Sequence, residues 1–448
     1  MQIESYKNKQ KVIVGLGQTG LSCARYLDSQ NKKFTVIDSR TAPPGLEEFR
    51  KNFPNIKVEL GVFKEQTVLE AEELIVSPGV DLRTPVLKQA QQSGVPVTGD
   101  VNIFSKKVSS PIVAVTGSNA KSTVVTLLAE MAKNAGIDVA LAGNIGKPVL
   151  DLLLEKPRSL YVLELSSFQL ETTSMLGAKV AAVLNLSPDH MDRYDSVEDY
   201  YQAKYKIFEA CQQVVVNRDD PLTRLLLPES VKEWSYGLTP GGLNEFGLVI
   251  NAGETFLAFN KEPLLSTREL KMAGQHNVKN ALAALTLGYA AGFEFEPMVA
   301  TLKEFSGLPH RCQWVAEKAG VNYYNDSKGT NVGACVAAIE GLAEKGRIVL
   351  LAGGVGKDAD FSQLAEPLGN FGKLAILYGK DANLIARAIE EKIQVIKVSS
   401  LEEALQTANE QAQQGDVVLL SPACASFDMY QNFEQRGEAF IHAVRTLH

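Results

Sequence analysis

The stretch VIVGLGQTGLS, residues 12–22, decides the fold of the first part of the chain. An apolar run leads into Gly15, Gly17 and Gly20, and this G-x-G-x-x-G spacing is typical of a dinucleotide-binding turn. Asp38 closes the next apolar run about twenty residues further on, where that fingerprint has an acidic residue. Taken alone, the stretch predicts a parallel α/β domain that binds NAD.

The same alternation of apolar strands and amphipathic helices continues along the chain and predicts three consecutive doubly wound α/β domains. A chain of 448 residues is long enough for roughly three domains of ordinary size. We expect these domains to span residues 1–99, 100–307 and 308–448. The polar segment 97–111 suggests a linker, and the alternating segment 247–259 suggests a hairpin in a small side sheet.

Composition excludes several classes of protein. The net charge of −7 argues against a nucleic-acid surface, which normally needs a basic face. The polar start MQIESYKNKQ lacks an apolar signal region, and no apolar run approaches the length of a membrane span. The five cysteines are scattered without a C-x-x-C pair, so we expect reduced thiols in a cytoplasmic protein, with neither disulfides nor a zinc site.

A second glycine loop, VAVTGSNAKST at residues 113–123, predicts phosphate binding. A buried strand enters a tight loop and a helix begins at once, so loop amides and the positive helix end would hold phosphate oxygens. The side chain of Lys121 would reach the β- and γ-phosphates, and the hydroxyl of Ser122 or Thr123 would help to hold Mg²⁺. The candidate ATP-binding residues here are Gly117, Ser118, Asn119, Ala120, Lys121, Ser122 and Thr123.

This loop departs from the strict phosphate-loop pattern in two ways. It is shorter than G-x-x-x-x-G-K-[ST], and Ala120 occupies a position where glycine is usual. Because alanine prefers a negative φ, we expect Ala120 to keep a negative φ and to limit how closely the backbone approaches a phosphate.

Two strand ends carry candidate magnesium ligands. Glu164 ends an otherwise apolar strand, where a carboxylate is costly unless it meets a cation, either the nucleotide's Mg²⁺ or a nearby lysine. His190 lies between Asp189 and Asp192 in a turn after another apolar strand, and is either a metal ligand or a simple turn residue. Since ligands bind at the carboxyl ends of parallel strands, both residues should face one crevice.

Lys204 is the least obvious candidate. The segment 196–209 predicts a helix capped by Ser196, and Lys204 falls on its apolar stripe whereas Lys206 points away from it. A lysine that faces the interior tends to lose its proton and become nucleophilic, and its amine can take up CO₂ to form a carbamate. From the residues alone, a lysine that extends its charged end to solvent is the simpler interpretation.

Three loops of the last domain combine small residues with hydroxyls or cations. They are NDSKGTN at 325–331, LLAGGVGKDADF at 350–361 and LLSPACASFDMYQNFEQRGEAF at 419–440. Each follows an apolar strand, so together they would clamp a small dicarboxylate and close over ATP. Each could equally be an ordinary loop or helix cap.

Taken together, these motifs in this order resemble the Mur ligase family. The resemblance covers all three domains, through GLGQTG, SPG, TGSNAKST, AGNIG, LELSSFQLE, DHMDRY, GQHNVKNALAAL, LPHR, NDSKGTN, SPACAS and NFEQRG. It implies that the first glycine turn holds the uridine diphosphate of a sugar substrate rather than NAD. It also implies a central ATP-binding domain and a C-terminal domain that closes over the site and binds an amino acid.

The resemblance also implies roles for individual residues. Lys121 would grip ATP phosphate, Ser122 and Glu164 would bind Mg²⁺, and His190 with a carbamylated Lys204 would hold a second Mg²⁺. Further ATP contacts would come from Asn277, Asn280, Arg311, Asp326 and Lys328. The UDP substrate would contact Gly17, Gln18, Thr19, Asp38, Ser39, Arg40, Gly79 and Asn144. D-glutamate would contact Thr330, Lys357, Ser426 and Phe433.

The implied reaction is ATP-dependent addition of D-glutamate to UDP-N-acetylmuramoyl-L-alanine through an acyl phosphate, by a chain that we expect to act as a monomer. A diaminopimelate-adding member usually carries D-N-P-R, which this sequence lacks, and alanine-adding members and folylpolyglutamate synthases lack its SPACAS…NFEQRG ending. An NAD-dependent oxidoreductase would leave TGSNAKST unexplained. A nucleotide sensor would bind ATP without turnover that depends on D-glutamate.

Overall fold

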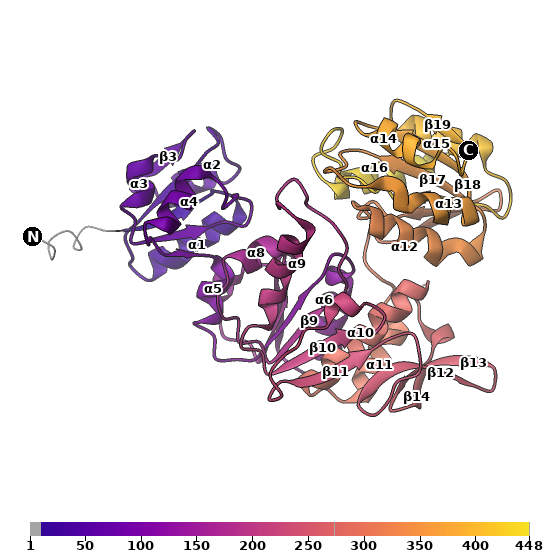
Figure 1. The fold of residues 1–448 in the computed structure, drawn as a ribbon, viewed down its shortest axis with the longest axis horizontal. Helices are drawn as coiled ribbons and strands as arrows, with labels where there is room; N and C mark the ends of the chain where they lie inside the picture. The colour runs from indigo at the N-terminus through magenta and orange to yellow at the C-terminus, as the bar shows by residue number, and fades with distance from the viewer. Residues whose placement is uncertain (1–9, 273, 448) are drawn as a thin grey trace, which may run out of the picture.

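The computed structural model describes residues 10–272 and 274–447 and forms three α/β domains in chain order (Figure 1). The expectation of a polar amino terminus without a signal region falls mainly on residues 1–9, which lie outside the described residues. The central domain lies between the other two and contacts both (Figure 1). Three α/β sheets confirm the predicted fold class.

The first domain contains a parallel sheet of five strands in the order β3-β2-β1-β4-β5. Its strands are β1 (Lys11–Val14), β2 (Phe34–Asp38), β3 (Val58–Leu60), β4 (Glu73–Val76) and β5 (Val97–Thr98). Its helices are α1 (Gln18–Ser29), α2 (Leu46–Asn52), α3 (Glu65–Leu69) and α4 (Pro85–Gln92). The glycine turn joins β1 to α1, and a Cβ on Gly20 would lie 2.1 Å from the carbonyl oxygen of Gly15. The close packing of strand against helix therefore requires glycine at this position.

The predicted linker at 97–111 is wrong. Its first residues form β5, and the next form helix α5 (Asp100–Ser105), in which Val101 and Phe104 are fully buried. The ring of Phe104 packs edge-on against Tyr161 of the central domain, with 5.1 Å between the ring centroids. The segment is polar on average, but Val101 and Phe104 are enough to pack it as a short helix on the central domain instead of leaving it in solvent.

The central domain contains a sheet of nine strands in the order β14-β13-β12-β11-β10-β9-β6-β8-β7. Its strands are β6 (Ile112–Thr116), β7 (Val139–Gly143), β8 (Leu160–Glu164), β9 (Val180–Val183), β10 (Gln213–Asn217), β11 (Lys232–Tyr236), β12 (Glu245–Asn251), β13 (Glu254–Phe259) and β14 (Glu262–Ser266). Its helices are α5, α6 (Lys121–Asn134), α7 (Val149–Leu152), α8 (Ser167–Glu171), α9 (Val197–Tyr205), α10 (Gln275–Ala291) and α11 (Phe295–Glu304).

The predicted hairpin at 247–259 is confirmed by the antiparallel pairing of β12 with β13. The separate side sheet is wrong, because β12 also pairs in parallel with β11 and so extends the main sheet. Ser235 lies opposite Glu245 in this pairing, and their side chains are hydrogen bonded at 2.9 Å.

The third domain contains a six-stranded sheet in the order β15-β16-β20-β17-β18-β19, with only β15 antiparallel to its neighbour. Its strands are β15 (Gln313–Lys318), β16 (Val321–Asn325), β17 (Ile348–Gly353), β18 (Gly372–Tyr378), β19 (Val395–Lys397) and β20 (Val417–Leu420). Its helices are α12 (Val332–Leu342), α13 (Ala365–Phe371), α14 (Ala382–Ile389), α15 (Leu401–Gln411) and α16 (Phe433–Thr446).

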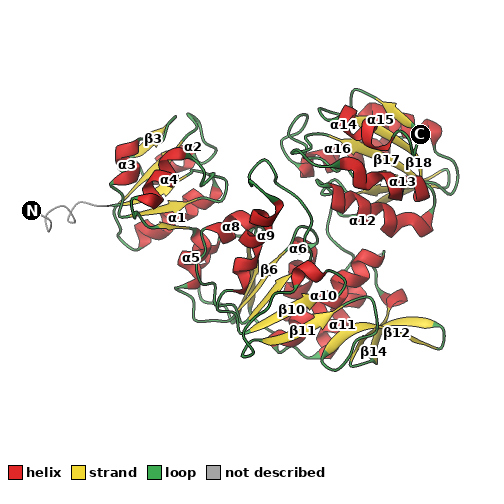
Figure 2. Ribbon diagram, viewed as in Figure 1, coloured by secondary structure: helices red, strands yellow, loops and turns green. Residues whose placement is uncertain are grey.

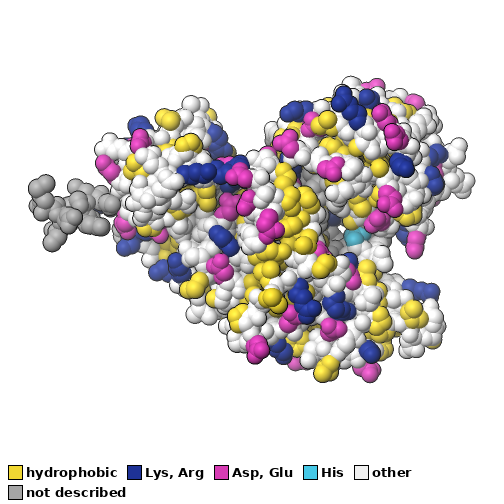
Figure 3. Space-filling model, viewed as in Figure 1, with side chains coloured by type: hydrophobic (Ala, Val, Ile, Leu, Met, Phe, Trp, Pro, Cys, Tyr) yellow, Lys and Arg dark blue, Asp and Glu magenta, His cyan; other side chains and the backbone are white. Residues whose placement is uncertain are grey.

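Helices cover both faces of these sheets (Figure 2), which leaves the ends of the strands as the open places for ligands. On the visible face, cationic and anionic side chains are intermixed over all three domains (Figure 3). None of the helices in the described part of the chain combines the length and apolar composition that a membrane crossing requires.

Candidate active site at the junction of the domains

The loop between β6 and α6 is held in shape by its neighbour Asn185. The amide of Ser118 donates to the Asn185 carbonyl at 2.9 Å, and the amide of Asn119 donates to its side-chain oxygen at 2.8 Å. These two amides are therefore already engaged. The amides of the first turn of α6, a helix start that no side chain caps, are available for an anion.

The expectation that Ala120 keeps a negative φ is wrong. Ala120 is the N-cap of α6 and has φ 66° and ψ −7°, in the left-handed region. A residue with a Cβ costs on the order of 1 kcal/mol there, so the tight turn into the helix outweighs the preference of alanine.

Ala120→Gly is expected to leave the free energy of unfolding unchanged or to raise it by up to about 1 kcal/mol. Glycine relieves the left-handed strain, and the greater entropy of the unfolded chain offsets part of that gain. Ala129→Gly, in the regular interior of the same helix, is the matched control and should lower the free energy of unfolding by about 1 kcal/mol or more. Urea titration of both variants measures the difference; equal losses would contradict the strain at Ala120.

Two lysines meet at one carbonyl of this loop. Lys121 Nζ donates to Gly117 O at 2.7 Å and to Ser118 O at 3.0 Å. Lys204 Nζ, which comes from α9, donates to the same Gly117 O at 2.9 Å. Lys204 is only 2% exposed, so the simpler interpretation of a lysine reaching solvent is wrong. Burial, and then the charge of Lys121, hold the pKa of Lys204 well below its ordinary value.

Glu164 ends β8 with a buried and only partly bonded carboxylate. Its side chain is 1% exposed, and its Oε1 accepts a hydrogen bond from Asn144 Nδ2 at 2.8 Å. Within the described residues, Oε2 has no hydrogen-bond partner. An unpaired buried carboxylate oxygen is costly, so this atom fits a cation supplied with a ligand.

His190 lies in the turn that follows β9, with a left-handed φ of 57°. Its backbone amide donates to Asp189 Oδ1 at 2.8 Å, and its ring meets the Phe168 ring edge-on with centroids 4.9 Å apart. Burial lowers the pKa of His190 to about 4, so the ring is neutral and has a lone pair to offer.

One cavity of about 660 Å³ brings the central and third domains together. The candidate residues that line it are Ser118, Asn119, Ala120, Lys121, Ser122, Asn144, Glu164, His190, Lys204, Arg311, Lys328, Thr330, Lys357, Ser426 and Phe433. Across the junction, Lys357 Nζ pairs with Asp189 Oδ1 at 2.8 Å, and Asn331 Nδ2 donates to Asn119 Oδ1 at 3.1 Å. The third domain is therefore docked on the phosphate loop and on the His190 turn.

A neighbouring cavity of about 470 Å³ continues beyond the phosphate loop. Its candidate residues are Asn119, Ala120, Thr123, Asn277, Asn280, Arg311, Asp326 and Lys328. Four of these, Asn119, Ala120, Arg311 and Lys328, also line the first cavity. The two cavities thus border the phosphate loop from either side. A polyphosphate bound to the loop would have room for a nucleoside in one cavity and for a second reactant in the other.

The candidate residues of the first domain line a third cavity of about 620 Å³. They are Gly17, Gln18, Thr19, Asp38, Ser39, Arg40, Gly79 and Asn144. Asp38 is 2% exposed and is already engaged, because its Oδ2 accepts the Leu16 amide and the Arg40 guanidinium, both at 2.7 Å. Asn144 also lines the central cavity and so lies where the two cavities approach each other.

The protein side chains alone do not form a ready-made metal cluster. Over residues 10–272 and 274–447, no three His, Cys, Asp or Glu side chains gather closely enough to hold an ion. The partly unpaired Glu164 and the neutral His190 each offer a single ligand to the cavity. Phosphate oxygens, hydroxyls and water would therefore complete the coordination of Mg²⁺, which commonly keeps several such ligands.

Some residues that build the site were not predicted. Phe168 lines the cavity and packs against His190, and Asn331 joins the third domain to the phosphate loop. Both lie inside stretches that the sequence singles out, LELSSFQLE and NDSKGTN. The contact of Phe168 depends on how α8 and the His190 turn pack within the central domain, and that of Asn331 on how the third domain docks, and no local pattern reports either.

Comparison with known proteins places all three domains in one family. Residues 9–99 match the Mur ligase MurD-like N-terminal domain, residues 115–288 the Mur ligase middle domain, and residues 310–424 the Mur ligase glutamate ligase domain. The UDP-N-acetylmuramoylalanine–D-glutamate ligase of Pseudomonas aeruginosa is 52% identical over 98% of each chain. The Pseudomonas putida protein of the same name is 52% identical over 97% of each chain. A solved pseudomurein peptide ligase type C from Methanothermus fervidus superposes with a TM-score of 0.63, at 20% identity over 97% of this chain and 100% of its own.

Proposed function

Because this chain belongs to the Mur ligase family, we propose that it uses ATP to join D-glutamate to UDP-N-acetylmuramoyl-L-alanine in the synthesis of a peptidoglycan precursor. The relatives at about half identity over nearly the whole chain carry that name. The observation that carries the proposal is the single cavity in which Lys121, Glu164 and Lys357 meet. It combines a phosphate loop, a carboxylate with an unpaired oxygen and a cation from the closing domain.

The three cavities suggest how the substrates divide the molecule. We assign the uridine diphosphate to the first domain around Gly17 and Arg40, and the adenosine of ATP to the cavity around Asn277 and Asp326. The triphosphate would lie on the phosphate loop between the adenosine and the central cavity. D-glutamate would enter beside Lys357, with Thr330, Ser426 and Phe433 around it.

We propose that Ser122 and Glu164 help to hold one Mg²⁺, and that His190 and Lys204 help to hold a second. Lys204 would first take up CO₂: its uncharged amine forms a bond to the carbon and releases one proton, which leaves a carbamate with a carboxylate-like end. The lowered pKa of Lys204 favours this reaction because only the uncharged amine is nucleophilic. When bound, the ions supply charge neutralisation between two anionic reactants.

The chain's own residues would then serve two successive steps. The alanyl carboxylate of the substrate attacks the γ-phosphorus of ATP, which gives an acyl phosphate and ADP. Lys121 would offset the repulsion between these anions, once its ammonium leaves the loop carbonyls for phosphate. The D-glutamate amine then attacks the acyl carbon and phosphate leaves. The contacts of Lys357 and Asn331 across the domain junction would keep water from the acyl phosphate.

We also propose that the enzyme acts as a monomer in the cytoplasm. The predicted residues of the phosphate loop, the closing domain and the strand ends already meet within one chain, so the proposed chemistry does not call for a residue from a second copy. The five cysteines are free, and four of them are buried, which suits a compartment that keeps thiols reduced.

A phosphate-release assay with UDP-N-acetylmuramoyl-L-alanine tests the proposal. Release should require both this substrate and D-glutamate, with L-glutamate, L-lysine and diaminopimelate as comparison amino acids. Equal release with lysine or diaminopimelate would reassign the specificity. Tight NAD binding at the first glycine turn would favour an oxidoreductase, and ATP binding without turnover would favour a nucleotide sensor.

A further inference from the structure

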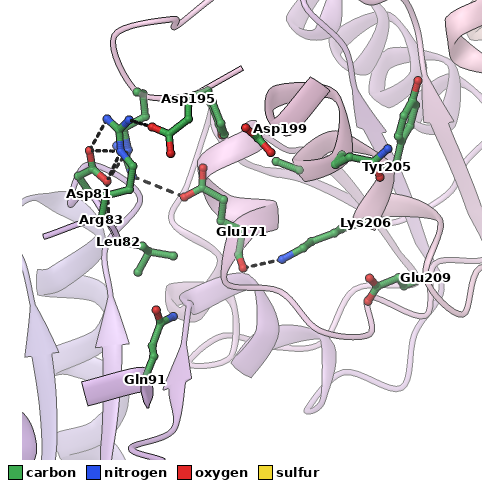
Figure 4. Close-up of a pocket in the computed structure, with 14 residues that line it drawn as sticks. Asp81, Leu82, Arg83, Gln91, Glu171, Asp195, Asp199, Tyr205, Lys206 and Glu209 are labelled. Carbon is green, nitrogen blue, oxygen red and sulfur yellow. Dashed lines mark hydrogen bonds and ion pairs between the residues drawn. The ribbon is translucent and has the colours of Figure 1, made fainter. Parts of the chain in front are cut away.

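A separate polar junction joins the first and central domains beside the reaction site. It borders a cavity of about 670 Å³ (Figure 4), in which Asp81 and Arg83 of the first domain face Glu171 and Asp195 of the central domain. Arg83 donates to Asp195 Oδ1 at 2.9 Å across this junction. The charges are thus used to hold two domains against each other.

Arg193 binds the backbone of the first domain at this junction. Its side chain is 12% exposed, and its guanidinium donates to the carbonyl oxygens of Pro78 at 3.2 Å and Val80 at 2.7 Å. These two carbonyls flank Gly79, which lines the cavity assigned to uridine diphosphate. A residue of the central domain therefore fixes the backbone on both sides of a loop that the first domain would use for its ligand.

The same guanidinium also reaches toward the reaction cavity. Its central carbon lies 4.3 Å from the centroid of the Phe168 ring, and that ring forms an edge contact with the ring of His190. The backbone amide of Arg193 donates to the His190 carbonyl at 2.8 Å, which closes the turn that carries the histidine. One side chain thus connects the Gly79 loop to the two rings beside the proposed metal position.

We propose that Arg193 is a positioning residue that couples occupancy of the UDP-substrate cavity to the placement of His190. A ligand that orders the Gly79 loop would hold the guanidinium, and the guanidinium would hold Phe168 and the His190 turn. The planar guanidinium donates from a rigid fork while its face stacks on a ring, whereas the compact ammonium of lysine has no planar face to stack and holds both contacts less firmly. This inference rests on the proposed function, since that function supplies the two ligands.

The junction offers a matched control. Arg83 also joins the two domains, through Asp195 and the Asp192 carbonyl, but the guanidinium–ring contact with Phe168 belongs to Arg193. If Arg193 only strengthened the interface, Arg83→Lys and Arg193→Lys would have similar effects. If Arg193 positions the turn, only Arg193→Lys should disturb the communication between ligands.

The experiment measures binding by calorimetry, without turnover. The affinity for UDP-N-acetylmuramoyl-L-alanine is determined with and without Mg²⁺ and a non-hydrolysable ATP analogue, in the unaltered protein, Arg193→Lys and Arg83→Lys. We expect these ligands to strengthen each other's binding about fivefold or more in the unaltered protein and in Arg83→Lys, and to bind almost independently in Arg193→Lys. By reciprocity, the affinity of the analogue should change by the same factor.

Phe168→Leu provides a second test, because it removes the stacked ring and retains the carbonyl contacts of Arg193. It should lose the coupling as Arg193→Lys does, so the inference stays testable if one variant folds poorly. Unaltered coupling in either variant, equal loss in Arg83→Lys, or independent binding in the unaltered protein would overturn the inference. Absence of phosphate release that depends on D-glutamate in the unaltered protein would instead overturn the proposed function.

Discussion

Lys204→Ala is expected to lower the rate of phosphate release about a hundredfold to a thousandfold. The substitution removes the amine that would carry the carbamate, and the loss of one preorganised charged group in a closed site has effects of this size. Lys204 is 2% exposed and donates to Gly117 O, so the substitution leaves a buried space beside the phosphate loop. Release of phosphate from ATP, with both other substrates saturating, measures the effect.

Acetate or propionate should partly restore the activity of Lys204→Ala, because the shortened side chain leaves space for a small carboxylate. Lys204→Arg is the matched control: it keeps a cation, fills the space and should gain nothing from either acid. Two results together would argue against a carbamate: neither acid restores the activity of Lys204→Ala, and neither changes the affinity of that variant for the ATP analogue. Full activity of Lys204→Ala would exclude any role for this side chain.

Lys121→Met is expected to lower phosphate release by a similar factor, about a hundredfold to a thousandfold. Methionine keeps most of the apolar stem and removes the charge that would approach the β- and γ-phosphates. Affinity for the ATP analogue should fall as well, whereas affinity for the UDP substrate alone should not. The two measurements together distinguish lost phosphate binding from a disturbed fold.

The control for Lys121→Met is Lys133→Met at the other end of the same helix. Lys133 is exposed and paired with Glu130, so its loss should change neither turnover nor nucleotide affinity. A small effect of Lys121→Met, comparable with that of Lys133→Met, would remove the phosphate loop from the proposed mechanism.

Sequence patterns predicted the helix ends and turns that are determined by neighbouring residues. The Ser196 cap begins α9, and the spacing of Gly15 to Gly20 forms the turn between β1 and α1. Each of these depends on a hydrogen bond or a backbone conformation within a few residues. The helix inside segment 97–111 was missed because its stability comes from packing on Tyr161, far away in the sequence.

At Ala120, too, a prediction from local preference fails because a distant residue determines the conformation. Its preference for a negative φ is correct for an isolated chain, and the loop held by Asn185 overrides it. The role of Arg193 was also out of reach, because its partners Pro78, Val80 and Phe168 come from two domains. Docking between domains is set by the summed fit of surfaces, and a single stretch carries little of that information.

In the structure, the carboxylate of Asp189 forms an ion pair with the ammonium of Lys357. If Lys357 binds a carboxylate of D-glutamate, that carboxylate must replace Asp189 as the partner of the ammonium. Replacing one ion pair by another yields less binding free energy than forming a new one. D-glutamate would therefore bind more weakly, and the product would dissociate more readily. The carboxylate of Asp189 would then pair with Lys357 again when the product leaves, which restores the free form of the site.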